Sequence, residues 1–591
     1  MSEEFTTVEI SKKLGHMGLM IKPKAAKTII KSNIPTENVL NYISESENIT
    51  STITNDVIVD ILDNMSNTES NSNTESNSIS DKDLNKLLNQ KSNKTSGNNT
   101  SNRAKTKDEE VEKDEEVESN KYTTKLIDPQ NSLAKLEEVI KKDEKVNEIE
   151  NRKETLHERY PDLCDVMFNR ELPESKPRVG VTKGYTVEGD ITGESRGTGD
   201  FEDFRQIFKD RHERLTKILS KRAKNVHRVS EIDKKTHGGK NLTIVGLVWS
   251  KFVSNNGNYF IELEDPKSNE TLRTVFTDDS IKDVFETVVP DEAIAIRGTL
   301  SDDGGIVFGD DEVRKGRPPI MFPDVPRKRS GDKGPDKKTQ AALISDIHVG
   351  ADEFYPKYWN KFVDWVRETP TVEYVIVAGD LVEGIGVFPN QDEELTIIDI
   401  YDQYAMMGKM FDQLPDDVKI ITSVGNHDTV RLAEPQPTLA EEFRTYFSDN
   451  VDFVGNPVNV NIDERDILIY HGMSINAIAE VIPDASADKP TTVMELMLKK
   501  RHVAPIYGKN VRLAGEEKDY LIIDTVPDLL HCGHVHKYDQ DKYNGVHIVN
   551  TATWQGQTSF QKSKGIEPDV GYWATLDLST MKLEQMDVDT V

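Results

Sequence analysis

The sequence predicts an α/β chain of several domains, and three observations support this prediction. Residues 341–561 contain five short apolar runs rich in Val and Ile, each followed at once by Asp, Asn or His. Residues 241–325 contain five strand-like segments separated by turn signals. A long polar segment near the N-terminus separates stretches with helical periodicity. With 591 residues, the chain is long enough for roughly three or four domains.

The composition is acidic, with 104 Asp and Glu against 74 Lys and Arg. This balance is unfavourable for a protein that holds a polyanion alone, so we expect a larger partner to supply most phosphate contacts. Two cysteines, Cys164 and Cys532, indicate a reducing compartment without a disulfide framework. The start is polar and acidic, and apolar runs stay well below the roughly 18 residues of a membrane span. We therefore expect a cytoplasmic protein without membrane contact.

The N-terminal third divides into three regions. Residues 1–62 alternate short apolar-periodic stretches with helix-start signals, which predicts a small helical module. Residues 63–125 are rich in Asn, Ser, Thr, Glu and Lys and repeat the hexad NTESNS, so we expect a disordered linker. Residues 126–240 form a partly helical connecting region. Its clearest helix follows Phe201 and has a basic face, which is either solvated or directed at phosphates.

Residues 241–325 predict a five-stranded barrel of the oligonucleotide-binding (OB) type. Such barrels bind single strands with aromatic and basic side chains. The candidates are Trp249, Lys251, Phe252, Tyr259 and Arg273. However, Glu262, Glu264 and Asp265 place negative charge among the same strands. Binding of nucleic acid and docking of a protein subunit are therefore both open. A connector rich in Pro, Gly and basic residues follows at 326–338.

The remaining residues, 339–591, carry the polar clusters that follow the apolar runs. Because ligand crevices of open α/β sheets lie at the strand ends, these clusters should meet at one edge of a sheet. Carboxylate, amide and imidazole groups without thiolate suit Mn, Fe, Zn or Mg. The candidate metal ligands are Asp346, His348, Asp380, Asn426, His471, His534 and His536.

Seven ligands are too many for one tetrahedral ion and suit two ions that share a carboxylate. Two ions about 3.5–4 Å apart clamp a phosphoryl centre and generate a hydroxide for in-line attack. His427 is not needed as a ligand and lies between Asn426 and Asp428. We expect His427 to act as the general acid or to contact phosphate, with Asp428 orienting its ring. Cys532, next to the last cluster, is expected to be a buried small side chain.

The order of the motifs DxH, GDxxxG, GNHD, HG and GHxH resembles that of the calcineurin-like metallophosphoesterase superfamily. The resemblance implies an αββα sandwich of two sheets. It also implies one metal held by Asp346, His348, Asp380 and His536, and a second held by Asp380, Asn426, His471 and His534. Many members have Asp and Arg at the end of the second motif, whereas this chain has Glu383 and Gly384. This departure leaves Asp380 in place but provides no Arg there.

Three further stretches resemble the small subunits of archaeal family-D DNA polymerases. They are Met494–Gly508, residues 516–536 and Asn550–Gln561, and the resemblance covers about the last 390 residues. It implies a proofreading 3′–5′ exonuclease with two divalent ions; Mn²⁺ is favoured, and Mg²⁺, Fe²⁺, Zn²⁺ and Ni²⁺ are the alternatives. It also implies as partners a large catalytic subunit, DNA primer–templates with single-stranded 3′ ends and, through the complex, a sliding clamp. The alternatives are a catalytically silent structural subunit and a stand-alone phosphodiesterase.

Within this domain, Tyr355–Glu368 and Asp399–Leu414 are predicted helices, and Glu383–Glu394 is a predicted loop over the site entrance. The helix predicted at Met494–His502 ends in a cluster of basic side chains, which suits either a DNA strand or a protein partner. The candidate nucleic-acid contacts are Lys499, Lys500, Arg501 and Trp554.

Overall fold

The computed structural model describes residues 149–591, except 179–183, 269, 329–337 and 509, together with a few earlier positions. The chain forms two compact units, Met1–Thr124 and Lys125–Val591. In the first unit, the strands β1 (Met20–Ile21) and β2 (Thr52–Ile53) pair in parallel. Four described residues of this unit are helical and buried: Ile29, Val39, Ile58 and Ile61. The rest of the helical module predicted for 1–62 and the linker predicted for 63–125 lie outside the described residues.

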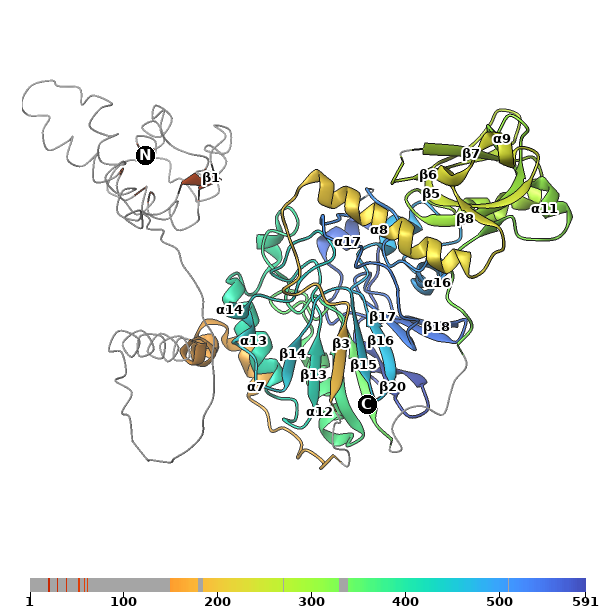
Figure 1. The fold of residues 1–591 in the computed structure, drawn as a ribbon. Helices are drawn as coiled ribbons and strands as arrows, with labels where there is room; N and C mark the ends of the chain where they lie inside the picture. Colours follow the sequence, from red (N-terminus) through yellow and green to blue (C-terminus); the bar gives the residue numbers. More distant parts are fainter. Residues whose placement is uncertain are drawn as a thin grey trace, which may run out of the picture. The chain divides into compact units, whose positions relative to one another are not determined.

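The second unit begins with a connecting region that packs against the domains after it. A helix at 149–159 and α7 (Pro161–Phe168) are followed by β3 (Tyr185–Glu188) and the long helix α8 (Phe201–Ser220). The connecting region also contributes the strand β3 to a large sheet, where it pairs with β15 at the edge. A pattern local in the sequence could not predict this pairing, because the partner strand of β3 lies more than 270 residues later. The helix predicted after Phe201 is confirmed as α8 (Figure 1).

The predicted OB-type barrel is confirmed as five strands that close on themselves. Each strand pairs with the next around the ring, and β8 pairs back with β5. The strands are β5 (Asn241–Val253), β6 (Tyr259–Asp265), β7 (Glu270–Phe276), β9 (Ile306–Phe308) and β8 (Ala293–Leu300). The short strands β4 (Val226–Arg228) and β10 (Ile320–Met321) extend it. The last of the five strands along the chain, β9, ends at Phe308, and Asp310–Arg314 form the helix α11.

The smaller helices of the barrel region lie in its connections. They are η1 (Val229–Glu231), α9 (Lys234–His237), η2 (Asp279–Ile281) and α10 (Lys282–Thr287). Apolar side chains from all five barrel strands point inward, for example Ile244, Ile261 and Ile296, which are fully buried. In β6 buried positions alternate with half-buried ones, as in the wall of a closed sheet.

The C-terminal domain is built on two six-stranded sheets. The first has the order β14 (Val451–Phe453), β13 (Lys419–Thr422), β12 (Val372–Val377), β11 (Gln340–Ile344), β20 (Tyr572–Asp577), β21 (Lys582–Asp587). The second has the order β18 (Asp539–Tyr543), β19 (Val546–Asn550), β17 (Leu529–Cys532), β16 (Arg465–Ile469), β15 (Val458–Ile462), β3. In the first sheet β11, β12, β13 and β14 are parallel, and in the second β16, β17 and β19 are parallel.

The two sheets pack face to face, with helices on both outer sides (Figure 1). Leu343 and Ile376 of one sheet meet Ile469 and Val549 of the other in the central core. The helices α12 (Pro356–Glu368) and α13 (Ile400–Phe411) cover the outer side of the first sheet. The helices α15 (Ile475–Ala479) and α16 (Thr491–Lys500) cover the second. The short helices η3 (Gln391–Glu394), α14 (Glu441–Arg444) and α17 (Ser559–Lys564) lie in connections. The predicted αββα sandwich is therefore confirmed.

A group of buried charged side chains joins α8 and the barrel to the sandwich. We call it the interdomain cluster; it comprises Arg211, Glu292, Lys500, His502 and Asp519. The Nζ of Lys500 lies 2.8 Å from the Oε2 of Glu292 at the start of β8. The Oδ2 of Asp519 accepts hydrogen bonds from Arg211 of α8 at 2.7 Å and from His502 at 2.9 Å. Two buried polar contacts therefore join the sandwich to its neighbours: Lys500 to the barrel and Asp519 to α8.

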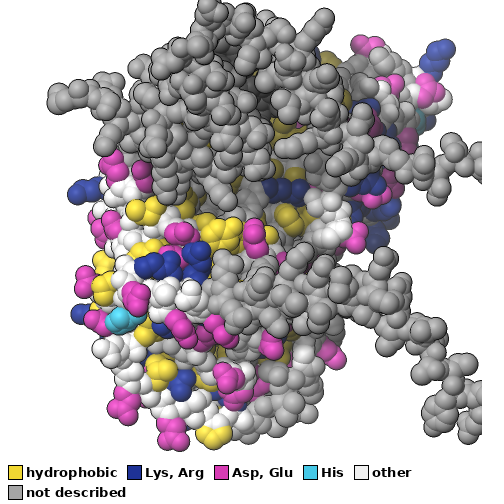
Figure 2. Space-filling view, turned by 90° about the vertical axis from the view of Figure 1, so that its left-hand side faces the viewer, with side chains coloured by type: hydrophobic (Ala, Val, Ile, Leu, Met, Phe, Trp, Pro, Cys, Tyr) yellow, Lys and Arg dark blue, Asp and Glu magenta, His cyan; other side chains and the backbone are white. Residues whose placement is uncertain are grey.

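The described surface in Figure 2 carries acidic, basic and hydrophobic side chains in a mixed arrangement, with acidic ones scattered throughout. None of the helices in the described part of the chain has the length and apolar character needed to cross a membrane.

Candidate metal centre

The seven predicted ligands lie together at one end of the sandwich. Five strands lead to them: β11, β12 and β13 in the first sheet, and β16 and β17 in the second. Asp346 and His348 follow β11, Asp380 follows β12 and Asn426 follows β13. His471 follows β16, and His534 and His536 follow β17. Since the strands within each group of neighbours are parallel, their carboxyl ends meet at the same edge.

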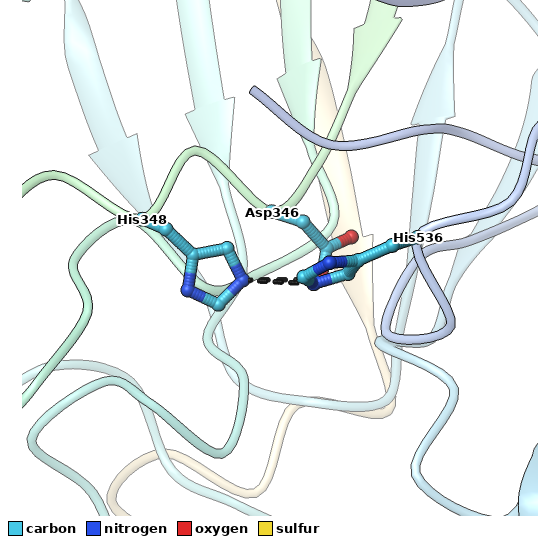
Figure 3. Close-up of side chains that lie close together, drawn as sticks. All are labelled: Asp346, His348 and His536. Carbon is cyan, nitrogen blue, oxygen red and sulfur yellow. Dashed lines mark hydrogen bonds and ion pairs between the residues drawn. The ribbon is translucent and has the colours of Figure 1, made fainter. Parts of the chain in front are cut away.

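One group of ligand atoms comes from Asp346, His348 and His536 (Figure 3). The Nε2 atoms of His348 and His536 face each other at 3.0 Å. The Oδ1 of Asp346 lies 3.5 Å from the Nε2 of His536 and 3.8 Å from the Nε2 of His348. At this distance the lone pairs of the two imidazole nitrogens would repel each other, unless a proton or a cation lies between them. This donor set fits a divalent cation.

A second group comes from Asp380, His471 and His534. The Nε2 of His471 lies 3.1 Å from the Oδ2 of Asp380 and 3.1 Å from the Oδ1 of Asn426. The same Oδ2 of Asp380 lies 3.8 Å from the Nε2 of His348, which belongs to the first group. Asp380 therefore stands between the two groups, where a carboxylate shared by two ions would stand.

The outer ring nitrogens of two histidines are held by hydrogen bonds. The Nδ1 of His348 donates to the Oε2 of Glu383 at 2.7 Å, and the Nδ1 of His471 donates to the carbonyl of Ala378 at 2.7 Å. With Nδ1 as the donor, Nε2 is the atom that would bind a cation once its own proton is lost. The Nδ1 of His536 contacts the Nε2 of Gln561 at 2.8 Å.

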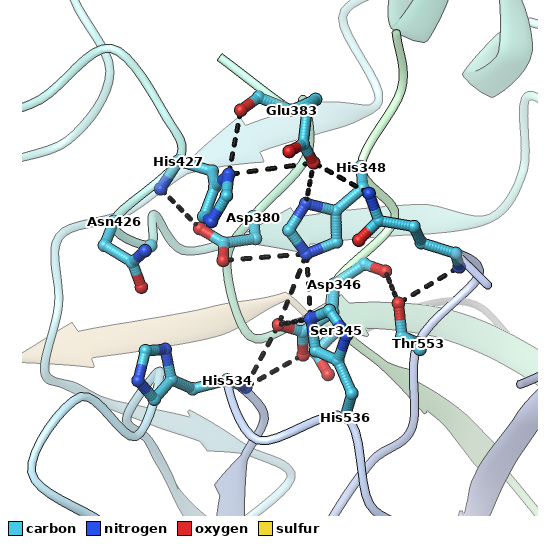
Figure 4. Close-up of polar contacts among 12 residues, drawn as sticks. Ser345, Asp346, His348, Asp380, Glu383, Asn426, His427, His534, His536 and Thr553 are labelled. Carbon is cyan, nitrogen blue, oxygen red and sulfur yellow. Dashed lines mark hydrogen bonds and ion pairs between the residues drawn. The ribbon is translucent and has the colours of Figure 1, made fainter. Parts of the chain in front are cut away.

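Glu383 is the residue of this site that the sequence did not reveal as functional. It was noted only as a departure from a family motif, yet its side chain is 2% exposed and hydrogen-bonds His348 (Figure 4). The amides of Gln391 and Gln555 donate to its two oxygens at 3.1 Å each. Burial alone would raise its pKa, but the neighbouring imidazoles of His427 and His348 lower it to about 2. The signal that could have identified it was a lone Glu three residues after a predicted metal ligand.

The backbone at the site is strained. Five predicted ligands have positive φ angles: Asp346, His348, Asp380, His534 and His536. Residues other than glycine seldom adopt positive φ angles. Such angles persist where the surrounding structure stabilises them, often at functional sites. The glycines leave room for the ligands. A Cβ on Gly425 would lie 2.2 Å from the Oδ1 of Asp380, and one on Gly533 would lie 2.3 Å from the Oδ2 of Asp346. The GNHD and GHxH motifs therefore need their glycines for close approach.

The electrostatics keep both carboxylates of the site ionised. Burial opposes ionisation of Asp346, but hydrogen bonds from His348 and His536 hold its pKa well below the usual value. Burial is likewise offset at Asp380, where the charge of His471 lowers the pKa. Asp380 in turn raises the pKa of His471 to about 9 although burial opposes this. Burial lowers the pKa of His534 to about 3, so that ring is neutral. Two carboxylates among buried imidazoles provide the negative charge that a cation requires.

His427 lies beside this centre, as predicted, but Asp428 does not orient its ring. The Nδ1 of His427 donates to the carbonyl of Glu383 at 2.8 Å, and its backbone N–H donates to the Oδ1 of Asp380 at 2.8 Å. The carboxylate of Asp428 accepts from the backbone N–H groups of Asp380 at 3.0 Å and Gly425 at 2.9 Å. The prediction for Asp428 is therefore wrong. Its carboxylate links the loops after β12 and β13, because it accepts hydrogen bonds from the backbone of both. Burial, with the charge of Asp380, raises its pKa to about 7.

Three of the four predicted nucleic-acid contacts are also wrong. Lys500 is 1% exposed and paired with Glu292. Arg501 is 5% exposed and donates to the carbonyl of Asp524. Trp554 is fully buried between Trp359, Phe362 and Trp573. The basic run was therefore a domain contact, which spacing alone could not distinguish from a surface patch. Lys499 is partly exposed above Phe322, and its role stays a prediction. Cys532 is buried and free, as expected.

The fold and the arrangement of the site define a calcineurin-like phosphoesterase domain, and the family model of that description matches residues 340–538. A DNA polymerase II small subunit of Halobacterium salinarum is 44% identical over 407 residues, which cover 68% of this chain and 78% of the relative. One of Archaeoglobus fulgidus is 40% identical over 395 residues, covering 65% and 76%. The chain therefore belongs to the family of small subunits of the archaeal family-D polymerase, DNA polymerase II.

Among solved structures, the chain is similar to one described as a novel archaeal phosphodiesterase. The two are 17% identical, and the match covers 42% of this chain and 99% of the other, with a TM-score of 0.23.

Proposed function

We propose that the sandwich domain is a metal-dependent 3′–5′ exonuclease that removes mismatched nucleotides from primer ends for a large polymerising subunit. The observation that carries this proposal is the shared Asp380 between two ligand groups, with His427 beside it. When bound, two divalent ions, with Mn²⁺ as the favoured pair, would supply Lewis-acid activation of the phosphodiester and of water. Asp346, His348, Asp380 and His536 would hold one ion, and Asp380, Asn426, His471 and His534 the other.

The role of His427 follows from how its ring is held. Its Nδ1–H donates to the carbonyl of Glu383, so the Nε2 is the atom left for the substrate. The side chain is 16% exposed, whereas the imidazole of His348 is 1% exposed. A protonated Nε2 there donates its proton to the leaving 3′-oxygen, or a hydrogen bond to a phosphate oxygen. A purely structural cation site has no use for a partly exposed imidazole fixed in this way.

The partners we propose follow from the family. The large catalytic subunit would bind this chain and supply most contacts to the primer–template, since this chain is strongly acidic. The sliding clamp would be reached through that complex, in the cytoplasm. The interdomain cluster connects the barrel and α8 to the sandwich. The large subunit would therefore bind the barrel and the sandwich as one rigid unit.

The test is degradation of an end-labelled primer–template with a 3′ mismatch in Mn²⁺, with this subunit alone and with the large subunit. The wild type should shorten the primer one nucleotide at a time. Asp380→Asn should abolish the reaction, because both ligand groups lose their shared carboxylate. His427→Ala should slow it by about 10²- to 10⁴-fold. His157→Ala, which removes an exposed histidine far along the chain, serves as the control.

Two outcomes would reject the proposal. If DNA stays intact with every variant even when the large subunit is present, the domain is a structural subunit. If the wild type hydrolyses only small phosphodiesters, it is a phosphodiesterase of another kind. Loss of activity in His157→Ala would show that the assay reports folding and not chemistry.

A further inference from the structure

A rigid apolar loop stands next to His427. Residues 384–390 have the sequence GIGVFPN and carry no charge, in a chain with 30% charged residues. Ile385 is 47% exposed, Pro389 is exposed, and Val387 and Phe388 are half-buried. The ring centroid of Phe388 lies 6.4 Å from that of His427, with the rings tilted by 60°. We call residues 385–389 the apolar loop.

The base of the apolar loop is fastened by two buried glutamines. The amide of Gln403 accepts from the N–H of Gly384 at 2.9 Å and donates to its carbonyl at 3.1 Å. The amide of Gln391 accepts from the N–H of Val387 at 2.9 Å and donates to the carbonyl of Glu383 at 2.8 Å. Gly384 is pressed so closely to the backbone of His427 that a Cβ there would lie 2.4 Å from the carbonyl oxygen. These contacts therefore hold the apolar loop in a fixed position relative to His427.

The charges nearby show which part of a nucleotide the apolar loop suits. Next to the start of this segment, a recess of about 100 Å³ is lined by residues of 555–559 and by four carboxylates: Asp352, Glu353, Glu383 and Glu394. Phosphates would be repelled there, whereas the apolar loop offers an uncharged surface with one aromatic ring. A nucleobase is the uncharged, flat part of a nucleotide, and its stacking on an aromatic side chain is worth about 1–3 kcal/mol.

We propose that Phe388, supported by the apolar loop, stacks on the base of the nucleotide that carries the leaving 3′-oxygen. This inference rests on the proposed function, because His427 marks the side of the site where that oxygen departs. Phe388 takes no part in the bond exchange. It positions the strand by a contact that tolerates any base, so that the terminal phosphodiester reaches the ligand groups. A primer end that frays readily would reach Phe388 more often than a paired one, and this gives mismatched ends their advantage.

The experiment compares Phe388→Ala and Phe388→Leu with the wild type on two substrates. On a single-stranded oligonucleotide, Phe388→Ala should trim the 3′ end roughly 5- to 100-fold more slowly, and Phe388→Leu should recover only part of the loss. On the same oligonucleotide with an abasic penultimate position, which offers no base to stack on, both variants should stay within about twofold of the wild type. Phe201→Ala, which removes a 79% exposed phenylalanine at the start of α8, is the matched control.

A substrate change tests the contact from the other side. An abasic penultimate position should slow the wild type by the same factor as Phe388→Ala, and the two changes together should cost no more than either alone. A readout without catalysis uses an oligonucleotide with 2-aminopurine at that position in EDTA. Its fluorescence should be quenched by the wild type and not by Phe388→Ala.

Several outcomes would overturn the inference. Equal losses on both substrates would mean that Phe388 only supports His427. Unchanged trimming together with weaker binding of the large subunit would make the apolar loop a protein contact. If the wild type trims no DNA, the proposed function fails by itself. Quenching of the 2-aminopurine would still support the stacking contact in that case, and its absence would reject it.

Discussion

The protein has two buried clusters of ionisable side chains, and they differ in how their charges are matched. In the interdomain cluster, Lys500 pairs with Glu292, and Asp519 accepts from Arg211 and His502. At the candidate metal centre, ring nitrogens face each other and several groups compete for Asp380. In the first cluster each carboxylate faces donors that the chain itself supplies, whereas the donor set of the second fits added cations. Burial of charge is common to both, so burial alone does not indicate chemistry; the unmatched donor set does.

The comparison predicts that damage to the interdomain cluster reduces stability but not chemistry. Asp519→Ala should lower the free energy of unfolding by about 3–5 kcal/mol, because Arg211 and His502 stay buried without their carboxylate. Urea denaturation measures this loss. Hydrolysis of bis(p-nitrophenyl) phosphate by the folded fraction should stay unchanged.

The control for Asp519→Ala is Glu202→Ala, which breaks an exposed contact with Arg205 and Lys209 on α8. It should leave the free energy of unfolding nearly unchanged, because solvent screens this exposed contact. An equally small loss for Asp519→Ala would mean that water or a rearrangement satisfies Arg211, and the contrast between the two clusters would be lost.

A second prediction concerns pH. Burial lowers the pKa of His502 from its ordinary value to about 4, and its ring is held neutral by an N–H donated from Ala504 to Nδ1. Unfolded His502 takes up a proton near pH 6.5, while the folded form does so only near pH 4. Between these pH values the unfolded state therefore binds more protons than the folded state. The stability that neutral His502 contributes is lost as the pH falls through this window, up to about 3 kcal/mol.

This pH effect is measured from urea midpoints at pH 7.5 and pH 5. His502→Gln keeps a donor for Asp519 but has no proton to gain, so its stability should fall less than that of the wild type over this range. If both proteins lose the same stability, His502 is not the group responsible.

The smallest expected effect lies at the metal centre. Glu383 accepts from His348, Gln391 and Gln555, and a glutamine in its place must turn its own N–H₂ toward one of these donors. Glu383→Gln should weaken binding of Mn²⁺ by about 10- to 100-fold, as loss of a hydrogen-bond partner of a histidine ligand does. Titration calorimetry measures the affinity, with Glu393→Gln, an exposed residue of the same loop, as the control.

The metal-free Glu383→Gln protein should lose about 1–3 kcal/mol of stability, because one buried donor then faces an N–H₂ group. A large loss of stability without loss of Mn²⁺ affinity would place Glu383 with the structural residues and remove the difference between the two clusters.

The comparison also explains where sequence interpretation worked. The convergence of Asp346, Asp380, His471 and His534 followed from apolar runs that end in polar residues, because parallel strands bring their carboxyl ends to one edge. Their role as ligands stays a prediction. The run from Lys499 to His502 has the same kind of local signal, yet Lys500 pairs with Glu292 of the barrel and His502 with Asp519. Local pattern shows that a residue is polar, but not whether its partner is solvent, substrate or a distant carboxylate.

The sequence by itself determined the barrel, the sandwich strands and the order of the predicted ligands, since hydrophobic periodicity and strand-end motifs are local properties of the chain. Tertiary structure alone decided that Glu383 turns inward onto His348, that Asp428 holds backbone and not a ring, and that Trp554 lies in the core. It also decided that β3 joins a sheet whose next strand lies far along the chain. These outcomes depend on which groups meet across long sequence distances, where hydrogen bonds and burial select the partner.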